Sequence, residues 1–157
     1  MTDTRRLYVT RSPEETGELA QAFGAILRPG DQILLEGPVG AGKTHFARCL
    51  IQSMLGWAED VPSPTFTLVQ TYDTAGSAIW HADLYRLTST HEIEELGLID
   101  AFHDAICLVE WPDRLGPLAP ADALEISLSP GTEEDSRRLT AEWSGGDWAE
   151  KLAAWRK

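Results

Sequence analysis

A glycine-rich segment in the first third of the chain has the residues of a phosphate-binding loop. It reads Gly37-x-x-x-x-Gly42-Lys43-Thr44 and lies between a short apolar run and a stretch with helical periodicity. Glycines at these positions let backbone N–H groups approach phosphate oxygens, and the start of the following helix adds partial positive charge. The lysine of such a loop reaches the β- and γ-phosphates, and the hydroxyl that follows it binds Mg²⁺. The segment therefore predicts a site for a nucleoside triphosphate with Mg²⁺.

The loop supplies most of the residues that we expect to contact the nucleotide. Lys43 is predicted to be exposed there, so that it acts through its charge and not through core packing. Pro38 has no N–H group, and any phosphate contact at that position must be made without one. The candidate nucleotide-binding residues of the loop are Gly37, Gly40, Ala41, Gly42, Lys43 and Thr44.

A metal beside the loop needs an acidic partner, and two carboxylates are candidates. Glu110 ends the apolar run 105–109, and Asp83 ends an expected strand over 78–83. Because ligands of open α/β sheets bind at the carboxyl ends of the strands, both side chains are predicted on the nucleotide side. The candidate catalytic residues are therefore Lys43, Asp83 and Glu110, and the candidate Mg²⁺ ligands are Thr44 and Glu110.

Three further residues carry weaker signals. His81 fits a structural role as well as a role in the site. Arg86 can reach a phosphate or pair with the neighbouring Glu94 or Glu95. Thr65, in the segment Ser63-Pro64-Thr65, can approach the metal or the γ-phosphate, although a rigid proline turn explains the segment nearly as well.

Capping signals and apolar runs indicate the elements that must position these residues. Ser12 with Glu15, and Ser89 with Glu92, have the spacing of capping boxes that start helices. Another helix is predicted from the loop to residue 55, and a last one after Asp147. Strands are predicted over 7–10, 33–35, 67–72, 78–83, 105–109, 124–128 and 137–143. Early strand–helix alternation followed by hairpins implies a mixed sheet covered by helices.

Length, charge and cysteine content limit the class of protein. The 157 residues, 43% of them hydrophobic, fit a single domain over 1–157. With 13 basic against 25 acidic residues, the net charge is −12, which argues against strong direct binding of nucleic acid. Two cysteines are too few for a disulfide framework, and no apolar run approaches the ~18 residues needed to span a bilayer. A cytoplasmic protein without a membrane anchor is expected.

Taken in order, the motifs resemble the TsaE (YjeE) family of bacterial P-loop ATPases, which support formation of threonylcarbamoyladenosine in tRNA. The resemblance extends from about Leu7 to Trp143, and its segments are 37–44, 63–69, 81–87, 95–97 and 110–111. The loop departs from the family, which commonly has Gly-Asp-Leu-Gly where this chain has Gly-Pro-Val-Gly at 37–40. Any role of that family aspartate is therefore not transferred.

The resemblance implies an α/β P-loop NTPase fold with a mixed, mostly parallel sheet flanked by helices, β-hairpins, and ATP with Mg²⁺ in the loop. It also implies partnership with the TsaB–TsaD complex, which modifies adenosine 37 of tRNAs reading codons that begin with A. The family member regulates or resets that complex and is not the transferase. The family positions matched here are Lys43 and Thr44 for phosphate and Mg²⁺, Glu110 for the metal, Asp83 as a functional acid, Trp111 beside the glutamate, and Ser12 as a neighbour of adenine.

Two other functional classes stay open. A small-molecule kinase shares the loop but normally carries an arginine-rich lid, and local arginine density beyond the N-terminus is limited to Arg137 and Arg138. A nucleotide-gated binding module with negligible hydrolysis would use 63–65 to sense the γ-phosphate. Because Arg48 is expected to point away from the γ-phosphate and Arg86 has competing partners, we expect slow hydrolysis alone and stimulation by TsaB–TsaD.

Overall fold

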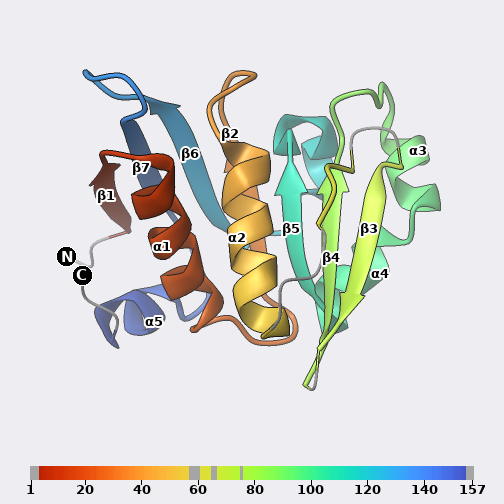
Figure 1. Cartoon of the computed structure of the whole chain (residues 1–157). Helices are drawn as coiled ribbons and strands as arrows, with labels where there is room; N and C mark the ends of the chain where they lie inside the picture. Colours follow the sequence, from red (N-terminus) through yellow and green to blue (C-terminus); the bar gives the residue numbers. More distant parts are fainter. Residues whose placement is uncertain (1–3, 57–60, 65–66, 75, 155–157) are drawn as a thin grey trace.

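The computed structural model describes residues 4–56, 61–64, 67–74 and 76–154 and contains a seven-stranded sheet with helices on its two faces (Figure 1). The strands are β1 (Arg5–Thr10), β2 (Gln32–Glu36), β3 (Val69–Asp73), β4 (Ala78–Asp83), β5 (Ile106–Glu110), β6 (Leu124–Pro130) and β7 (Arg137–Glu142). The helices are α1 (Pro13–Gly24), α2 (Lys43–Leu55), α3 (Thr90–Glu95), α4 (Leu98–Asp104), the 3-10 segment η1 (Pro112–Leu118) and α5 (Trp148–Ala154).

The strands are arranged in the order β1-β7-β6-β2-β5-β4-β3. Strands β6, β2, β5 and β4 form a continuous parallel block. β7 is antiparallel to β6 and to β1, and β3 is antiparallel to β4. The sheet is therefore mixed, and most of its strands point the same way, which confirms the predicted fold class. No helix of the described part of the chain has the length and apolarity to cross a membrane.

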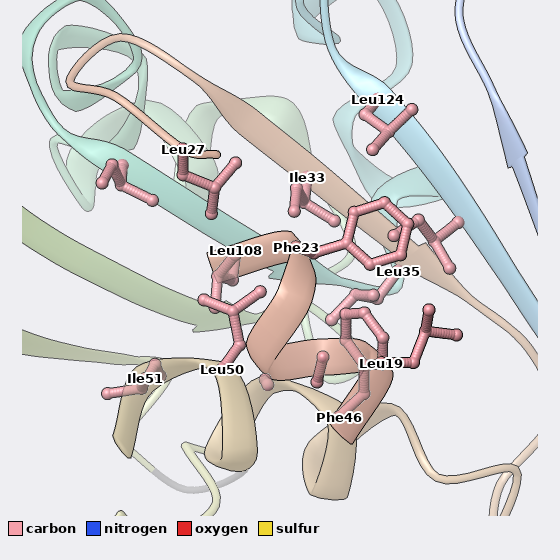
Figure 2. Packing of buried hydrophobic residues seen from close by; sticks show 14 of the residues in the cluster. Leu19, Phe23, Leu27, Ile33, Leu35, Phe46, Leu50, Ile51, Leu108 and Leu124 are labelled. Atoms are coloured by element: carbon pink, nitrogen blue, oxygen red, sulfur yellow. The ribbon is translucent and has the colours of Figure 1, made fainter. Parts of the chain in front are cut away.

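Two apolar clusters hold the helices on the sheet. Helices α1 and α2 pack on one face, where Phe23 and Leu50 meet strand residues such as Ile33 and Leu108 (Figure 2). The second cluster joins α3, α4 and η1 to the other face. Successive residues of β5 point to opposite faces, and all five are buried. This explains why 105–109 reads as an unbroken apolar run.

Local signals account for several helix boundaries. The Ser12 hydroxyl accepts a hydrogen bond from the Glu15 N–H at 3.1 Å and starts α1, while Gly56 ends α2 in the left-handed conformation. The Ser89 hydroxyl caps α3 in the same way, accepting from the Glu92 N–H at 3.3 Å. The short elements α4 and η1 were not predicted.

The last helix, α5, is fixed to the body of the protein by polar and apolar contacts. Lys151 Nζ lies 2.5 Å from Oδ2 of Asp31, in the turn that leads into β2, and 3.2 Å from Oδ1 of Asp147. The Trp148 indole N–H donates to the Asp122 carbonyl at 2.6 Å, and Trp148 is 1% exposed. Helix α5 therefore completes the apolar cluster beneath α1.

Replacing Trp148 by alanine should destabilise the protein by about 3–5 kcal/mol, the usual cost of removing a buried tryptophan from a core. Chemical denaturation followed by circular dichroism measures the change in the free energy of unfolding. Glu150→Ala is the matched control, because Glu150 lies exposed on the same helix. Equal stability of the two variants would contradict the packing role of Trp148.

Candidate nucleotide-binding site

The glycine-rich loop connects β2 to α2 and depends on glycine at both of its ends. Gly37 has φ of +146° and Gly42 has φ of +103°, in the region that favours glycine. A Cβ atom on Gly37 would lie 2.4 Å from the Leu128 carbonyl oxygen, so the neighbouring strand β6 leaves no room for a side chain. The loop therefore presents bare backbone at the start of α2, as a phosphate-binding loop requires.

A cleft of about 390 Å³ opens beside the loop. It is bounded by the loop, by the start of α2, and by the residues where β4 and β5 end. Its lining residues are Val39, Gly40, Gly42, Lys43, Thr44, His45, Asp83, Tyr85, Glu110 and Trp111. The ends of two parallel strands and a helix N-terminus thus meet at one opening, the usual position of ligands in open α/β sheets.

Lys43 is buried, and the expectation that it is exposed is wrong. The residue is 5% exposed. Its Nζ donates to the carbonyl oxygens of Gly37 at 2.5 Å and Pro38 at 3.0 Å, and lies 4.2 Å from the centre of a Trp111 ring. Burial lowers the pKa of the Lys43 ammonium, and the carboxylates of Glu110 and Asp83 only partly oppose this effect. The loop carbonyls and the indole enclose the side chain.

Nucleotide affinity should therefore fall at a lower pH than it would with an ordinary lysine. An exposed lysine has a pKa of about 10.4. The pKa of Lys43 is lowered, so its ammonium loses its proton at a lower pH than an exposed lysine does. ADP affinity measured by calorimetry from about pH 7 upward should begin to decline before the pH reaches the ordinary lysine pKa. Lys43→Arg provides the control, because a guanidinium keeps its charge throughout. Constant wild-type affinity up to the ordinary lysine pKa would contradict the lowered value.

Thr44 and Glu110 lie in direct contact in the cleft. The Thr44 hydroxyl is 2.9 Å from Oε1 and 3.1 Å from Oε2 of Glu110, which is 2% exposed. Asp83 is the register partner of Glu110 on the neighbouring strand, is 5% exposed, and accepts a hydrogen bond from the Tyr85 N–H at 3.0 Å. The structure thus brings Asp83, Glu110 and Thr44 to the same edge of the sheet.

These oxygens suit a small hard cation. Mg²⁺ is usually bound through one or two protein oxygens, with waters and substrate phosphates completing its shell. A hydroxyl touching a carboxylate beside a phosphate-binding loop matches that donor set. No group of three or more His, Cys, Asp or Glu side chains arranged for a metal occurs among the described residues. At such Mg²⁺ sites the phosphates and water supply the remaining ligands.

Two contacts in this region were not predicted from the sequence. The guanidinium of Arg137, on β7, donates from Nε to the Ala41 carbonyl at 3.0 Å and approaches the Gly40 carbonyl at 3.5 Å. Arg137 therefore supports the loop from the strand behind it. His81 Nε2 lies 2.7 Å from Oε2 of Glu110, so His81 contacts a candidate site residue. Such contacts between distant segments leave no local sequence pattern.

The other candidate residues lie in different surroundings. The Ala41 N–H donates to the Pro38 carbonyl at 3.1 Å, within the loop. The Ser12 hydroxyl caps α1, next to a second cleft between the end of β1 and the β6–β7 turn. Arg48 donates to the Val61 carbonyl at 2.9 Å and is not among the residues that line the loop cleft. Thr65 lies outside the described residues.

Comparisons with known proteins agree on one family. The family model described as "Threonylcarbamoyl adenosine biosynthesis protein TsaE" matches residues 10–139. A curated tRNA threonylcarbamoyladenosine biosynthesis protein TsaE from Rickettsia bellii is 42% identical over 131 residues, or 83% of this chain and 90% of the relative. The protein of that name from Bacillus subtilis is 38% identical over 132 residues, or 83% of this chain and 81% of the relative.

A solved structure shares the fold over nearly the whole chain. The crystal structure of Bacillus subtilis YdiB matches with a TM-score of 0.78 and 28% sequence identity, and covers 98% of this chain and 95% of YdiB. The family match spans most of the chain and includes the loop and the ends of β4 and β5. The chain therefore belongs to the TsaE family, which takes part in the biosynthesis of threonylcarbamoyladenosine in tRNA.

Proposed function

We propose that this chain is a Mg²⁺-dependent ATPase required for threonylcarbamoyladenosine at position 37 of tRNAs reading codons that begin with A. It acts as one cytoplasmic domain over 1–157, and it regulates or resets the TsaB–TsaD complex without being the transferase. The observation that carries the ATPase assignment is the contact of Thr44 with Glu110 beside the glycine-rich loop. The contact supports the proposal because a hydroxyl and a carboxylate beside a phosphate-binding loop are protein ligands that Mg²⁺ bound to a nucleotide uses.

Each residue of the cleft has a distinct role in this proposal. The backbone of 37–42 holds the phosphates. When a nucleotide binds, Lys43 donates to phosphate oxygens in place of the carbonyls of Gly37 and Pro38. Thr44 and Glu110 would hold Mg²⁺, which when bound neutralises charge that develops on the phosphates. Asp83, at the neighbouring strand end, orients the attacking water. Catalysis of this kind is positioning and electrostatic stabilisation with little covalent chemistry.

Hydrolysis by the protein alone is expected to be slow, because Arg48 and Arg137 both donate to backbone carbonyls. Arg48 donates to Val61, and Arg137 donates to the loop carbonyls from behind. An arginine directed at the γ-phosphate accelerates phosphoryl transfer by about 10³–10⁵-fold. We therefore propose that docking to TsaB–TsaD completes or reorders the site, through a surface that includes the segment 63–66.

Steady-state phosphate release from ATP tests this function. The protein is assayed alone and with saturating TsaB–TsaD, with the partner complex alone as the control. Slow release that rises in the complex supports the proposal. Nucleotide binding without release in either condition favours the nucleotide-gated module. ADP formed only with an added small-molecule acceptor, with the phosphoryl group on that acceptor and no phosphate released, favours a kinase. If the protein alone hydrolyses ATP as fast as the complex does, partner stimulation is wrong.

The isolated protein should bind tRNA only weakly. Its 25 acidic residues outnumber its 13 basic residues, and binding to the phosphate backbone depends on basic clusters. Electrophoretic mobility shift or fluorescence anisotropy with tRNA at physiological salt measures the affinity. Sub-micromolar binding by the purified protein would contradict this expectation.

A further inference from the structure

His81 is a fully buried polar side chain in largely apolar surroundings. It lies on β4 between Ile79 and Asp83, and it is 0% exposed. Ile79 and Leu108, the register partner of His81 on β5, both belong to the apolar cluster beneath α1 and α2. Burial of a polar ring costs free energy unless hydrogen bonding compensates for the lost water. The position of His81 therefore has to be explained by its partner.

That partner is the carboxylate of Glu110. Nε2 of His81 lies 2.7 Å from Oε2 of Glu110. Because an ionised carboxylate only accepts hydrogen bonds, Nε2 must carry the proton and donate it. The Thr44 hydroxyl approaches the same carboxylate and lies closer to Oε1, at 2.9 Å, than to Oε2, at 3.1 Å. The carboxylate is therefore held from two sides, by β4 and by α2.

The contact with Glu110 defines what the His81 ring can do. Its other nitrogen, Nδ1, has no hydrogen-bond partner among the described residues. Glu110 lines the cleft beside the loop, whereas His81 is not one of the described residues that do so. Any influence of His81 on a ligand in the cleft therefore passes through the Glu110 carboxylate.

We propose that His81 is a positioning residue for Glu110 and thereby sets the affinity of the site for Mg²⁺. The inference rests on the proposed Mg²⁺-nucleotide function. By donating to Oε2 from the buried side, His81 fixes the rotation of the carboxylate and leaves Oε1 directed toward Thr44. Hydrogen-bond partners that orient a metal ligand in this way account for about 10–100-fold in metal affinity.

Two amide substitutions separate this role from a general need for a polar side chain. In His81→Gln the amide nitrogen reaches the place of Nε2 and still donates to Glu110. In His81→Asn the amide takes the place of Nδ1 and falls short of the carboxylate. The dissociation constant of ADP is measured by calorimetry in excess Mg²⁺ and in EDTA. The ratio of the two constants isolates the metal's contribution without any turnover.

The Asn variant should lose about 10–100-fold in the Mg²⁺-dependent gain of ADP affinity and keep its affinity in EDTA. The Gln variant should retain a nearly wild-type gain. An unchanged gain in Asn, or an equal loss of affinity in Mg²⁺ and in EDTA, overturns the inference. If the Asn variant fails to fold, His81→Met replaces it, since methionine fills similar space without a donor, and an unchanged gain there overturns the inference too. A wild-type protein whose ADP affinity is independent of Mg²⁺ overturns the proposed function itself.

Discussion

Replacing Lys43 by alanine should reduce ATP turnover by at least about 10²–10³-fold, the usual loss when one charge-stabilising donor is removed from a transition state. Among the described residues that line the cleft beside the loop, Lys43 is the one lysine or arginine. Alanine leaves the developing negative charge on the phosphates without this partner. Phosphate release under saturating ATP, with and without TsaB–TsaD, measures the effect.

Stability must be followed in the same variant, because Lys43 is buried. Its loss removes two hydrogen bonds to loop carbonyls, a cost of about 1 kcal/mol each, and relieves the burial of a charge. We therefore expect Lys43→Ala to stay folded at room temperature. Arg28→Ala, which removes an exposed cation in the loop between α1 and β2, is the charge-matched control and should hydrolyse ATP normally. A folded Lys43→Ala protein with full turnover would refute the site assignment.

The second large effect is expected for Glu110→Gln, which keeps the size of the side chain and removes its charge. Hydrogen-bond partners of a metal ligand typically account for about 10–100-fold in metal affinity or activity. Loss of a direct ligand should therefore reduce turnover by at least about 100-fold. The amide also replaces a carboxylate that accepts hydrogen bonds from both Thr44 and His81. Turnover measured against Mg²⁺ concentration should be lower and require more Mg²⁺ for its half-maximum.

Glu125→Gln is the matched control for this substitution. Glu125 lies exposed on β6, and its side chain does not line the cleft beside the loop. Its replacement removes the same charge from the same sheet without touching the Thr44 contact. If both variants retain wild-type turnover and the same Mg²⁺ requirement, Glu110 is not a metal ligand.

Local patterns predicted the loop and the strands that carry the site. The motif at 37–44 depends on residues adjacent in sequence, and the apolar run before Glu110 indicates a strand buried on both faces. The parallel register of β4 and β5 then places Asp83 opposite Glu110. The ordered motifs were also sufficient for the family, since the resemblance to TsaE is confirmed by the comparisons.

Long-range contacts explain what the sequence did not predict. Lys43 is buried because the Trp111 ring, from the end of β5, lies over its ammonium. Trp111 adopts φ of +59°, a conformation that is rare for a bulky residue and that its neighbours in sequence do not predict. The short helix α4 was missed because its seven residues carry too few turns for a clear periodicity. Helix boundaries that depend on packing against distant residues likewise cannot be predicted from local patterns.

The contacts of α5 with the turn before β2 show that the folding unit extends beyond the residues that the family model matches. The family match ends at residue 139, inside β7. Beyond it, Trp148 and Leu152 are almost entirely buried in the main apolar cluster. A fragment cut at the last matched residue would split a strand and expose core side chains. Expression fragments of this protein should therefore include every segment whose side chains are buried in the core. They should extend through α5, even though the family match stops before it.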